Sequence, residues 1–484
     1  MKLNNPELLR SQCLINGEWC DALSGKREAV INPATGAELA SIPLVSEEET
    51  QQAIAAAQRA QNDWKQLTAK QRSALLLAWA DKVLAAQEDL AQLMTAEQGK
   101  SLAEARGEVT YAASVITWFA EEAKRVDGAV LQAPQASQRL VVVKQPIGVC
   151  AAITPWNFPA AMITRKVAPA LAAGCAIIVK PAEQTPLTAL ALAKLAQDAG
   201  IPAGVLQVVT GEAAQVGKVL CDSPVVRKLS FTGSTEVGRI LMAQCAPSIK
   251  KLSLELGGNA PVIVFDDANL DAAVAGIMAS KFRNSGQTCV CANRIYVQDG
   301  IYERLAEKLV AAVEQLKVGD GSQEGTTQGP LIDSDAVAKV QSHIDDALIK
   351  GAQIATGGQP HALGGTFFQP TVVTGVTQKM RFAKEETFGP VAPLFRFHDE
   401  AEAIAMANDT EFGLAAYLFT QNAARQWRVP EALEYGMVGI NTGLISNEVA
   451  PFGGVKQSGL GREGSRYGIE EYLELKYLCI DVSR

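Results

Sequence analysis

Two cysteines separated by a single residue are the first feature of this sequence that suggests chemistry. Cys289 and Cys291 lie in the polar stretch NSGQTCVCANR, residues 284–294. A thiol can bind a metal, form a disulfide, act as a nucleophile or pack as a small residue. Its ordinary pKa is about 8.5, so a catalytic cysteine needs a neighbour that takes its proton or stabilises the thiolate. All 3 histidines lie far along the chain from this pair, which turns the search for that neighbour to a carboxylate.

A metal site is a weak interpretation of the two thiols. A tetrahedral zinc site needs four thiolate or imidazole ligands, usually in short-spaced pairs, and the chain contains no CxxC. The 9 cysteines are an odd number scattered through the chain, which is typical of free thiols in a reducing compartment. We therefore expect no metal. A nucleophile with a spare thiol and two small buried residues both stay open.

Two other residues could assist a reactive thiol. Glu255 ends the apolar stretch KLSLE, where burial would raise the pKa of its carboxyl group towards neutrality. Gly257 and Gly258 follow it and allow an unusual backbone path. Asn157, in TPWNFP, could direct its amide at an oxyanion or could form an ordinary turn. Each residue taken alone has a structural explanation of similar weight.

The elements that must position these residues follow a regular alternation from about residue 148 to 260. VCAAIT (149–154) and AIIVK (176–180) predict strands, because they are short and rich in β-branched residues. The stretches around 160–173 and 185–200 predict helices. Strands that alternate with helices are typical of βαβ units, which form a parallel sheet with its functional loops at the carboxyl ends of the strands.

The rest of the chain extends this organisation. A long helical region, about 46–125, precedes the alternation, and a second alternating region follows at about 261–440. The polar segment 133–146 could form an extended arm. The predicted fold class is therefore α/β, with two doubly wound regions. At 484 residues the chain has room for roughly three domains of about 150 residues each.

Composition argues against several classes of function. Hydrophobic residues make up 48% of the chain and charged residues 20%, which is ordinary for a globular protein. A net charge of −8 without any Lys/Arg-rich tract argues against nucleic-acid binding. The N-terminus has no apolar signal core, and no apolar stretch reaches membrane-spanning length. We expect a cytoplasmic protein with no nucleic-acid partner and no membrane partner.

Two loops could hold a nucleotide, although no GxGxxG fingerprint occurs in a usable setting. FTGSTEVGR (231–239) places Gly233 and Ser234 between an expected strand and an expected helix. Backbone N–H groups at a helix start attract phosphate, but a plain N-cap is the commoner explanation of such a turn. In KPAEQTP, Lys180 and Glu183 could hold a ribose, and a polar loop is the alternative.

Seven motifs, in this order and at suitable separations, make the chain resemble the aldehyde dehydrogenase superfamily along essentially its whole length: ITPWNFP, KPAEQTP, FTGSTEVG, LELGGNAP, NSGQTCV, EETFGPV and PFGGVKQSGLGREG. The resemblance implies an atypical Rossmann cofactor domain (1–122 and 146–257) and a catalytic domain that carries the nucleophile (258–457). It also implies an oligomerisation arm and C-terminal segment (123–145 and 458–484), and hence a homo-oligomer, either a dimer or a tetramer.

The resemblance also implies roles for individual residues. Cys289 is expected to attack the aldehyde, giving a thiohemiacetal and, after hydride passes to the nicotinamide, a thioester. The Asn157 side chain and the Cys289 backbone N–H form the implied oxyanion hole, and Glu255 is the implied base that activates water for hydrolysis. The positions implied to bind the dinucleotide are Thr154, Pro155, Trp156, Lys180, Glu183, Gly233, Ser234, Leu256, Glu386 and Phe388.

CVC, ITRK, KFRN and GLISNEVAPFGG resemble more closely a subfamily that oxidises succinate semialdehyde to succinate. In that subfamily the residues that match Arg165, Arg283 and Ser446 hold the substrate's distal carboxylate, and two guanidinium groups can bind one carboxylate through charge-assisted hydrogen bonds. Taken singly, Arg165 could be a solvated residue on an apolar helix, and Arg283 could form a surface ion pair. Glutarate semialdehyde, or a broad range of aldehydes, is the alternative substrate.

Two questions follow from the resemblance. Glu183 would accept hydrogen bonds from the adenosine ribose and repel a 2′-phosphate, which favours NAD as the coenzyme, with NADP open as a second one. Cys291 is either a small packing residue or one half of a reversible Cys289–Cys291 disulfide that switches the enzyme off under oxidation, as the subfamily suggests.

Overall fold

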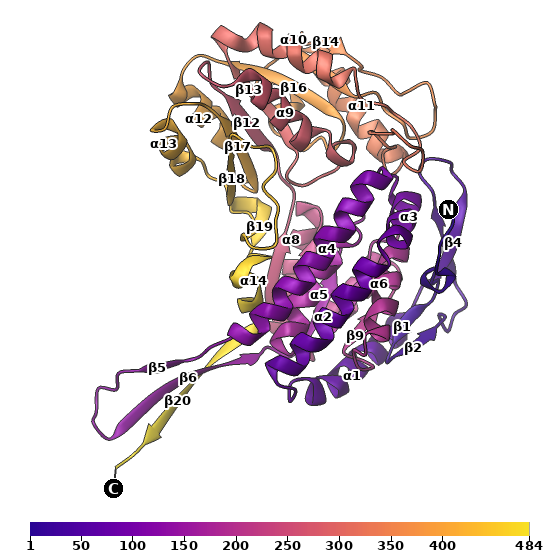
Figure 1. The fold of residues 1–484 in the computed structure, drawn as a ribbon, viewed down its shortest axis with the longest axis vertical. Helices are drawn as coiled ribbons and strands as arrows, with labels where there is room; N and C mark the ends of the chain where they lie inside the picture. The colour runs from indigo at the N-terminus through magenta and orange to yellow at the C-terminus, as the bar shows by residue number, and fades with distance from the viewer. Residues whose placement is uncertain (484) are drawn as a thin grey trace.

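The computed structural model describes residues 1–483, which form two large sheets, a three-stranded arm and a two-stranded hairpin. In Figure 1, the first large sheet and the long N-terminal helices form one body, the second large sheet forms another, and the arm projects from the first. The prediction of an α/β fold with two sheet-containing regions is confirmed.

The first large sheet has the strand order β19-β11-β10-β7-β8-β9-β1-β2. Strands β11 to β9 of this order run parallel, whereas β19 and β1 run antiparallel to their neighbours and β2 pairs antiparallel with β1. Its strands are β1 (Cys13–Ile15), β2 (Glu18–Cys20), β7 (Val149–Ile153), β8 (Ile177–Lys180), β9 (Leu206–Val208), β10 (Val226–Thr232), β11 (Lys251–Glu255) and β19 (Gly459–Leu460). Its crossover helices are α5 (Ala161–Ala173), α6 (Pro186–Asp198), α7 (Ala213–Asp222) and α8 (Thr235–Cys245).

The strands expected at 149–154 and 176–180 are β7 and β8, and the helices expected beside them are α5 and α6. Local sequence explains where these helices begin and end. Pro186 lies at the first turn of α6, where its missing N–H is not needed. Gly174 ends α5 with a left-handed φ of 97°.

A layer of long helices packs against the first sheet. They are α1 (Glu47–Trp64), α2 (Ala69–Ala85), α3 (Gln87–Gln98) and α4 (Leu102–Glu122). Helices α1, α2 and α4 each begin with a capping box, in which a Ser or Thr and the Glu or Gln three residues later satisfy each other's free N–H groups. Helix α4 lies between α2 and α5, so its apolar side chains, including Phe119, join the core of this body.

The second large sheet has the order β14-β15-β16-β13-β12-β17-β18 and is parallel except for the edge strand β14. Its strands are β12 (Ala260–Val264), β13 (Ala292–Gln298), β14 (Gln353–Thr356), β15 (Thr371–Val376), β16 (Val391–Phe397), β17 (Ala415–Phe419) and β18 (Met437–Ile440). Its helices are α9 (Leu270–Lys281), α10 (Tyr302–Val313), α11 (Ser334–Ile349), α12 (Glu400–Asn408) and α13 (Arg425–Ala432).

The arm consists of β5 (Ala129–Leu131), β6 (Gln138–Pro146) and β20 (Leu473–Asp481), in the order β20-β6-β5. Strand β20 pairs with β6 along its whole length and follows the short helix α14 (Ser465–Glu470). Several apolar side chains of the arm are exposed, among them Val130 and Leu475. A separate hairpin, β3 (Arg27–Ile31) with β4 (Glu38–Pro43), lies beside the first sheet.

The predicted division into domains stays a prediction, and one detail bears on it. Strand β19, at Gly459–Leu460, belongs to the first sheet, although the expected boundary assigns residues from 458 onward to the arm and C-terminal segment. In the part of the chain that the structure describes, no helix has both the length and the apolar character that crossing a membrane requires.

Candidate active site

Cys289 is half-buried at the meeting point of two cavities. One cavity, of about 320 Å³, is also lined by Arg165, Arg283 and Ser446. The other, of about 270 Å³, is also lined by Pro155, Trp156, Asn157, Gly233, Ser234, Leu256, Glu386 and Phe388. The structure therefore gathers the expected carboxylate-binding residues on one side of the thiol and most of the expected dinucleotide-binding residues on the other.

The segment before Cys289 has a strained backbone. It begins with a short turn, η4 (Arg283–Gly286), in which Asn284 and Ser285 have left-handed φ angles of 50° and 54°. Gly286 follows with a φ of 75°, and a Cβ there would collide with the Gly389 carbonyl. Only glycine fits this position without moving the backbone. This turn redirects the chain after α9, so that Cys289 faces both cavities.

Asn157 lies just before α5 and close to the cysteine segment. The side-chain Nδ2 of Asn157 donates a hydrogen bond to the Gln287 backbone carbonyl oxygen at 3.0 Å. The backbone carbonyl oxygen of Asn157 accepts from Asn284 Nδ2 at 2.9 Å. One N–H of the Asn157 amide is left for another acceptor. The arrangement fixes the amide beside Cys289, as an oxyanion donor requires.

A buried ion pair that the sequence analysis missed supports this loop. Lys100 Nζ and Glu108 Oε2 lie 2.5 Å apart, and both side chains are buried. Lys100 Nζ donates to the Asn157 carbonyl oxygen at 2.8 Å, and Glu108 accepts from the backbone N–H groups of Ala160 and Ala161. No sequence signal identified the pair, because KSLAEARGEV (100–109) does not distinguish a buried charge from a solvated one.

Burial raises the pKa of the Cys289 thiol to about 12. The positive charge of Arg165 opposes this shift, while Glu386 and Glu255 add to it. Burial therefore favours the protonated thiol of Cys289 at neutral pH. A group that accepts its proton, or additional positive charge, is needed to form the thiolate.

Glu255 lies at the end of β11, as expected, and is 3% exposed. Among the described residues neither of its carboxyl oxygens has a hydrogen-bond partner. Burial raises its pKa well above the ordinary value, the nearby Glu463 adds to the shift, and Arg165 opposes it. A carboxylate whose pKa is raised by burial is a stronger base than an ordinary carboxylate, which suits a general base.

Glu463 is the second residue that the sequence analysis missed. Its carboxylate pairs with Lys166 and lies 2.7 Å from Arg165 Nη2, although that second contact is not aligned as a hydrogen bond. Burial opposes ionisation, but Lys166 and Arg165 hold the pKa of Glu463 below its usual value. Two adjacent cations on the apolar helix α5 were a usable signal, since buried cations need a counter-ion.

The two arginines of the 320 Å³ cavity have different surroundings. The Arg165 guanidinium is buried, lies 3.8 Å from the centre of the Phe452 ring and shares Glu463 with Lys166. The Arg283 guanidinium lies 5.1 Å from the centre of the Phe158 ring and makes no ion pair within the described residues. Arg283 is therefore the uncommitted positive charge of this cavity.

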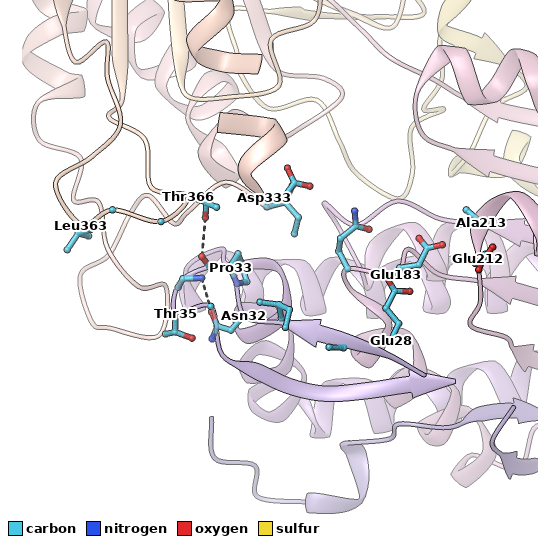
Figure 2. Close-up of a pocket in the computed structure, with 18 of the residues that line it drawn as sticks. Glu28, Asn32, Pro33, Thr35, Glu183, Glu212, Ala213, Asp333, Leu363 and Thr366 are labelled. Atoms are coloured by element: carbon cyan, nitrogen blue, oxygen red, sulfur yellow. Dashed lines mark hydrogen bonds between the residues drawn. The ribbon is translucent and has the colours of Figure 1, made fainter. Parts of the chain in front are cut away.

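Figure 2 shows a third cavity, of about 910 Å³. It adjoins the 270 Å³ cavity, because Ile332 and Asp333 line both. Glu183 lines it and pairs with Lys180, which is 1% exposed at the end of β8. Thr154 is also buried, and its N–H donates to the Lys180 carbonyl oxygen at 3.1 Å. Thr154 and Lys180 do not line the cavities themselves.

Residues suited to a dinucleotide lie along these two joined cavities. Glu183 lies in one and Glu386 in the other, and a carboxylate can accept hydrogen bonds from a ribose at each place. Burial raises the pKa of Glu386 to about 7, while a hydrogen bond from the Gly258 N–H, 3.1 Å long, opposes the shift. The Trp156 and Phe388 rings meet edge to face, with centroids 5.5 Å apart. The residues present therefore fit an extended dinucleotide.

The Gly233–Ser234 turn serves as an N-cap and is also open to the 270 Å³ cavity. Ser234 Oγ accepts from the Val237 N–H at 3.3 Å at the start of α8. A Cβ at position 233 would collide with the Phe231 ring, so the glycine permits close packing there. The N-cap interpretation is confirmed, and phosphate binding at this helix start stays a prediction.

Cys291 is fully buried and does not line the cavities around Cys289. Lys281 Nζ lies 3.2 Å from its Sγ and also donates to Asn293 Oδ1 at 3.1 Å. Both cysteines are free thiols. The packing role is visible in these contacts, and the Cys289–Cys291 disulfide stays a prediction.

Comparison with known proteins gives consistent matches along the whole chain. The Aldehyde dehydrogenase family pattern matches residues 19–478. The chain is 65% identical over 480 residues to succinate-semialdehyde dehydrogenase [NADP(+)] GabD of Escherichia coli K12, covering 99% of this chain and 100% of that protein. It is 64% identical over 482 residues to glutarate-semialdehyde dehydrogenase of Pseudomonas putida KT2440, covering 100% of both.

Solved structures agree with these matches. The crystal structure of succinate-semialdehyde dehydrogenase from Burkholderia pseudomallei superposes with a TM-score of 0.99 at 63% identity, over 100% of both chains. The crystal structure of betaine aldehyde dehydrogenase from Staphylococcus aureus in complex with NAD+ has a TM-score of 0.96 at 36% identity, over 98% of this chain and 96% of that one.

Proposed function

Because this chain belongs to the aldehyde dehydrogenase family, we propose that it oxidises succinate semialdehyde to succinate with a nicotinamide dinucleotide as hydride acceptor. The observation that carries this proposal is the position of Cys289 between two cavities. One cavity presents Arg165 and Arg283, and the other presents residues that fit a dinucleotide. The thiol can then meet a carboxylated aldehyde on one side and a hydride acceptor on the other.

In the first step the Cys289 thiol passes its proton to a solvent water molecule, and its sulfur attacks the aldehyde carbon. The carbonyl oxygen becomes an oxyanion, which accepts hydrogen bonds from the free N–H of the Asn157 amide and from the Cys289 backbone N–H. The coenzyme, when bound, supplies the acceptor for the hydride that leaves this carbon. The product that stays on Cys289 is a thioester.

In the second step Glu255, in its ionised form, takes a proton from the water that attacks the thioester. Burial of this carboxyl group, which has no hydrogen-bond partner in the part of the chain that the structure describes, makes its ionised form a stronger base. Arg165 and Lys166 balance the negative charge of the neighbouring Glu463, so Glu255 can ionise without two uncompensated carboxylates facing each other. Hydrolysis releases the acid and restores the thiol.

Recognition of the distal carboxylate depends mainly on Arg283, because Arg165 already shares Glu463. Ser446 lines the same cavity and can add a hydroxyl donor. Glutarate semialdehyde is the alternative substrate, since one extra methylene changes specificity by only about 10–200-fold and the P. putida relative is named for it.

The substrate proposal is tested by comparing kcat/KM for succinate semialdehyde with that for butanal, which has the same number of carbons and no carboxylate. We expect an advantage of about 100-fold, or about 2.7 kcal/mol, for the charged substrate. In Arg283→Met most of this advantage should disappear while the value for butanal stays unchanged. Equal values for both aldehydes in the unaltered protein would show a general aldehyde dehydrogenase instead.

We propose NAD as the preferred coenzyme and NADP as a second one. Glu183 supports NAD, because its carboxylate can accept hydrogen bonds from both ribose hydroxyls and repels a 2′-phosphate. The E. coli relative is named as NADP(+)-dependent, which supports use of the second coenzyme. We also propose that the arm joins subunits into a homo-oligomer.

A further inference from the structure

The 910 Å³ cavity is lined by several acidic side chains and by no basic one among the described residues. Of the described residues that line it, Glu28, Glu183, Glu212 and Asp333 carry carboxyl groups, and none is a lysine, arginine or histidine. Figure 2 shows Glu28 directly beside Glu183, with Glu212 close by and Asp333 across the cavity. Glu28 comes from the β3–β4 hairpin, outside the strand and helix units of the first sheet, and Glu212 directly precedes α7.

A cation, Lys180, lies behind this surface and is paired with one of its carboxylates. Lys180 is buried and paired with Glu183, which reduces the positive charge that a nearby anion would meet. Glu28 and Glu212 form no ion pair within the described residues. Burial, followed by the charge of Glu183, raises the pKa of Glu28, and the Lys180 ammonium feels the charge of Glu28. Glu28 is therefore near enough to act on a charge placed beside Lys180 and Glu183.

We propose that Glu28 is a second determinant of coenzyme choice, which acts with Glu183 to disfavour the 2′-phosphate of NADP. The inference rests on the proposed function, in which Lys180 and Glu183 hold the adenosine ribose. A 2′-phosphate carries up to two negative charges and would enter a surface where the negative charges of Glu28 and Glu212 have no partner. Replacing Glu183 alone therefore leaves part of the discrimination in place.

The test is the dissociation constant of NAD and of NADP for the free protein, measured by isothermal titration calorimetry without any aldehyde. In Glu28→Gln we expect NADP to bind about threefold to tenfold more tightly while NAD changes less than about twofold. Glu28→Gln combined with Glu183→Ser should favour NADP more than Glu183→Ser does alone. Glu38→Gln, on the neighbouring strand β4 and outside the cavity lining, is the matched control and should change neither constant.

Salt provides a second test that needs no substitution. Raising the ionic strength from about 0.02 M to about 0.3 M shortens the range of charge repulsion, so the NADP:NAD ratio of dissociation constants should move towards one. This change should be smaller in Glu28→Gln. The proposal is overturned if Glu28→Gln and Glu38→Gln give the same ratio, or if salt leaves the ratio of the unaltered protein constant.

The failure of this inference can be distinguished from failure of the proposed function. Reduction of NAD by succinate semialdehyde tests the function, whereas the ratio of dissociation constants tests Glu28. Coenzymes that bind in the expected ratio to a protein without aldehyde oxidation would support the role of Glu28 and contradict the proposed reaction. Oxidation with a ratio that Glu28→Gln does not change would do the reverse.

Discussion

At the scale of single residues, burial favours the neutral forms of two groups of the site, the Cys289 thiol and the Glu255 carboxyl. The thiol of Cys289 has its pKa raised to about 12, and the pKa of Glu255 lies well above the range of an ordinary carboxyl group. Both groups must lose a proton to perform their proposed roles. The nearby charges of Arg165, Arg283 and Glu463 set how readily they do so. The raised pKa values of Cys289 and Glu255 should therefore appear in the pH dependence of the reaction.

The hydrolysis step should show the raised pKa of Glu255. Only the ionised carboxylate acts as a base, so below this pKa the rate of thioester hydrolysis should rise about tenfold per pH unit and then level off above it. The midpoint should lie above the ordinary carboxyl range. Rapid mixing that separates the initial burst of reduced coenzyme from the later steady phase measures hydrolysis alone. A steady phase with a midpoint near pH 4 would contradict the assignment of Glu255.

At the scale of elements, α4 supports both halves of the site. Its Glu108 accepts from the N–H groups at the start of α5 and pairs with Lys100, which lies two residues before α4 and donates to the Asn157 carbonyl oxygen. Glu104, in its first turn, accepts from the Asn284 N–H at 2.7 Å and so also fixes the turn before Cys289. Helix α4, with Lys100 just before it, thus holds Asn157 and the turn before Cys289 in place relative to each other.

Removing the charge of Glu108 tests this support. Glu108→Gln leaves the Lys100 ammonium buried without its counter-ion, which should lower the free energy of unfolding by about 3 kcal/mol. Glu121→Gln, which breaks a partly exposed pair with Lys124 at the end of the same helix, should cost less than about 1 kcal/mol. Urea denaturation of both variants measures the difference. Equal losses of unfolding free energy in the two variants would show that the buried pair contributes no more to stability than the exposed one.

Sequence patterns predicted the elements better than the contacts between them. The alternation of short apolar strands and Ala-rich helices located β7, β8, α5 and α6 to within a few residues, because each depends on local periodicity. The meeting of Glu463 with Lys166 depends on how the chain returns to the first sheet, and local periodicity carries no information about that path. The pairing of β20 with β6 is long-range in the same way.

At the scale of the whole molecule, the site uses both large sheets. Glu255 ends a strand of the first sheet, whereas Cys289 lies between α9 and β13 of the second. The 270 Å³ and 910 Å³ cavities extend from this junction towards the β3–β4 hairpin, so residues from most of the chain surround the proposed ligands. The arm projects away from the site. Its exposed apolar side chains are typical of a surface that another protein chain covers.

The arm gives a prediction about assembly. Leu475 and Tyr477 are 71% and 58% exposed in the single chain, and burying them against a second copy would remove apolar surface from water. The unaltered protein should be an oligomer, and Leu475→Asp should shift it towards smaller species. Light scattering coupled to size-exclusion chromatography measures the mass of each. A monomeric unaltered protein would contradict the proposed role of the arm.

The central claim, that Cys289 carries the acyl group and Glu255 removes it, is tested most directly by trapping the thioester. Glu255→Gln is mixed with NAD and succinate semialdehyde, then quenched in acid and analysed by peptide mass spectrometry. We expect one burst of reduced coenzyme and a succinyl group on the peptide that contains Cys289. Full turnover in this variant, or an acyl group on another residue, would contradict the central claim.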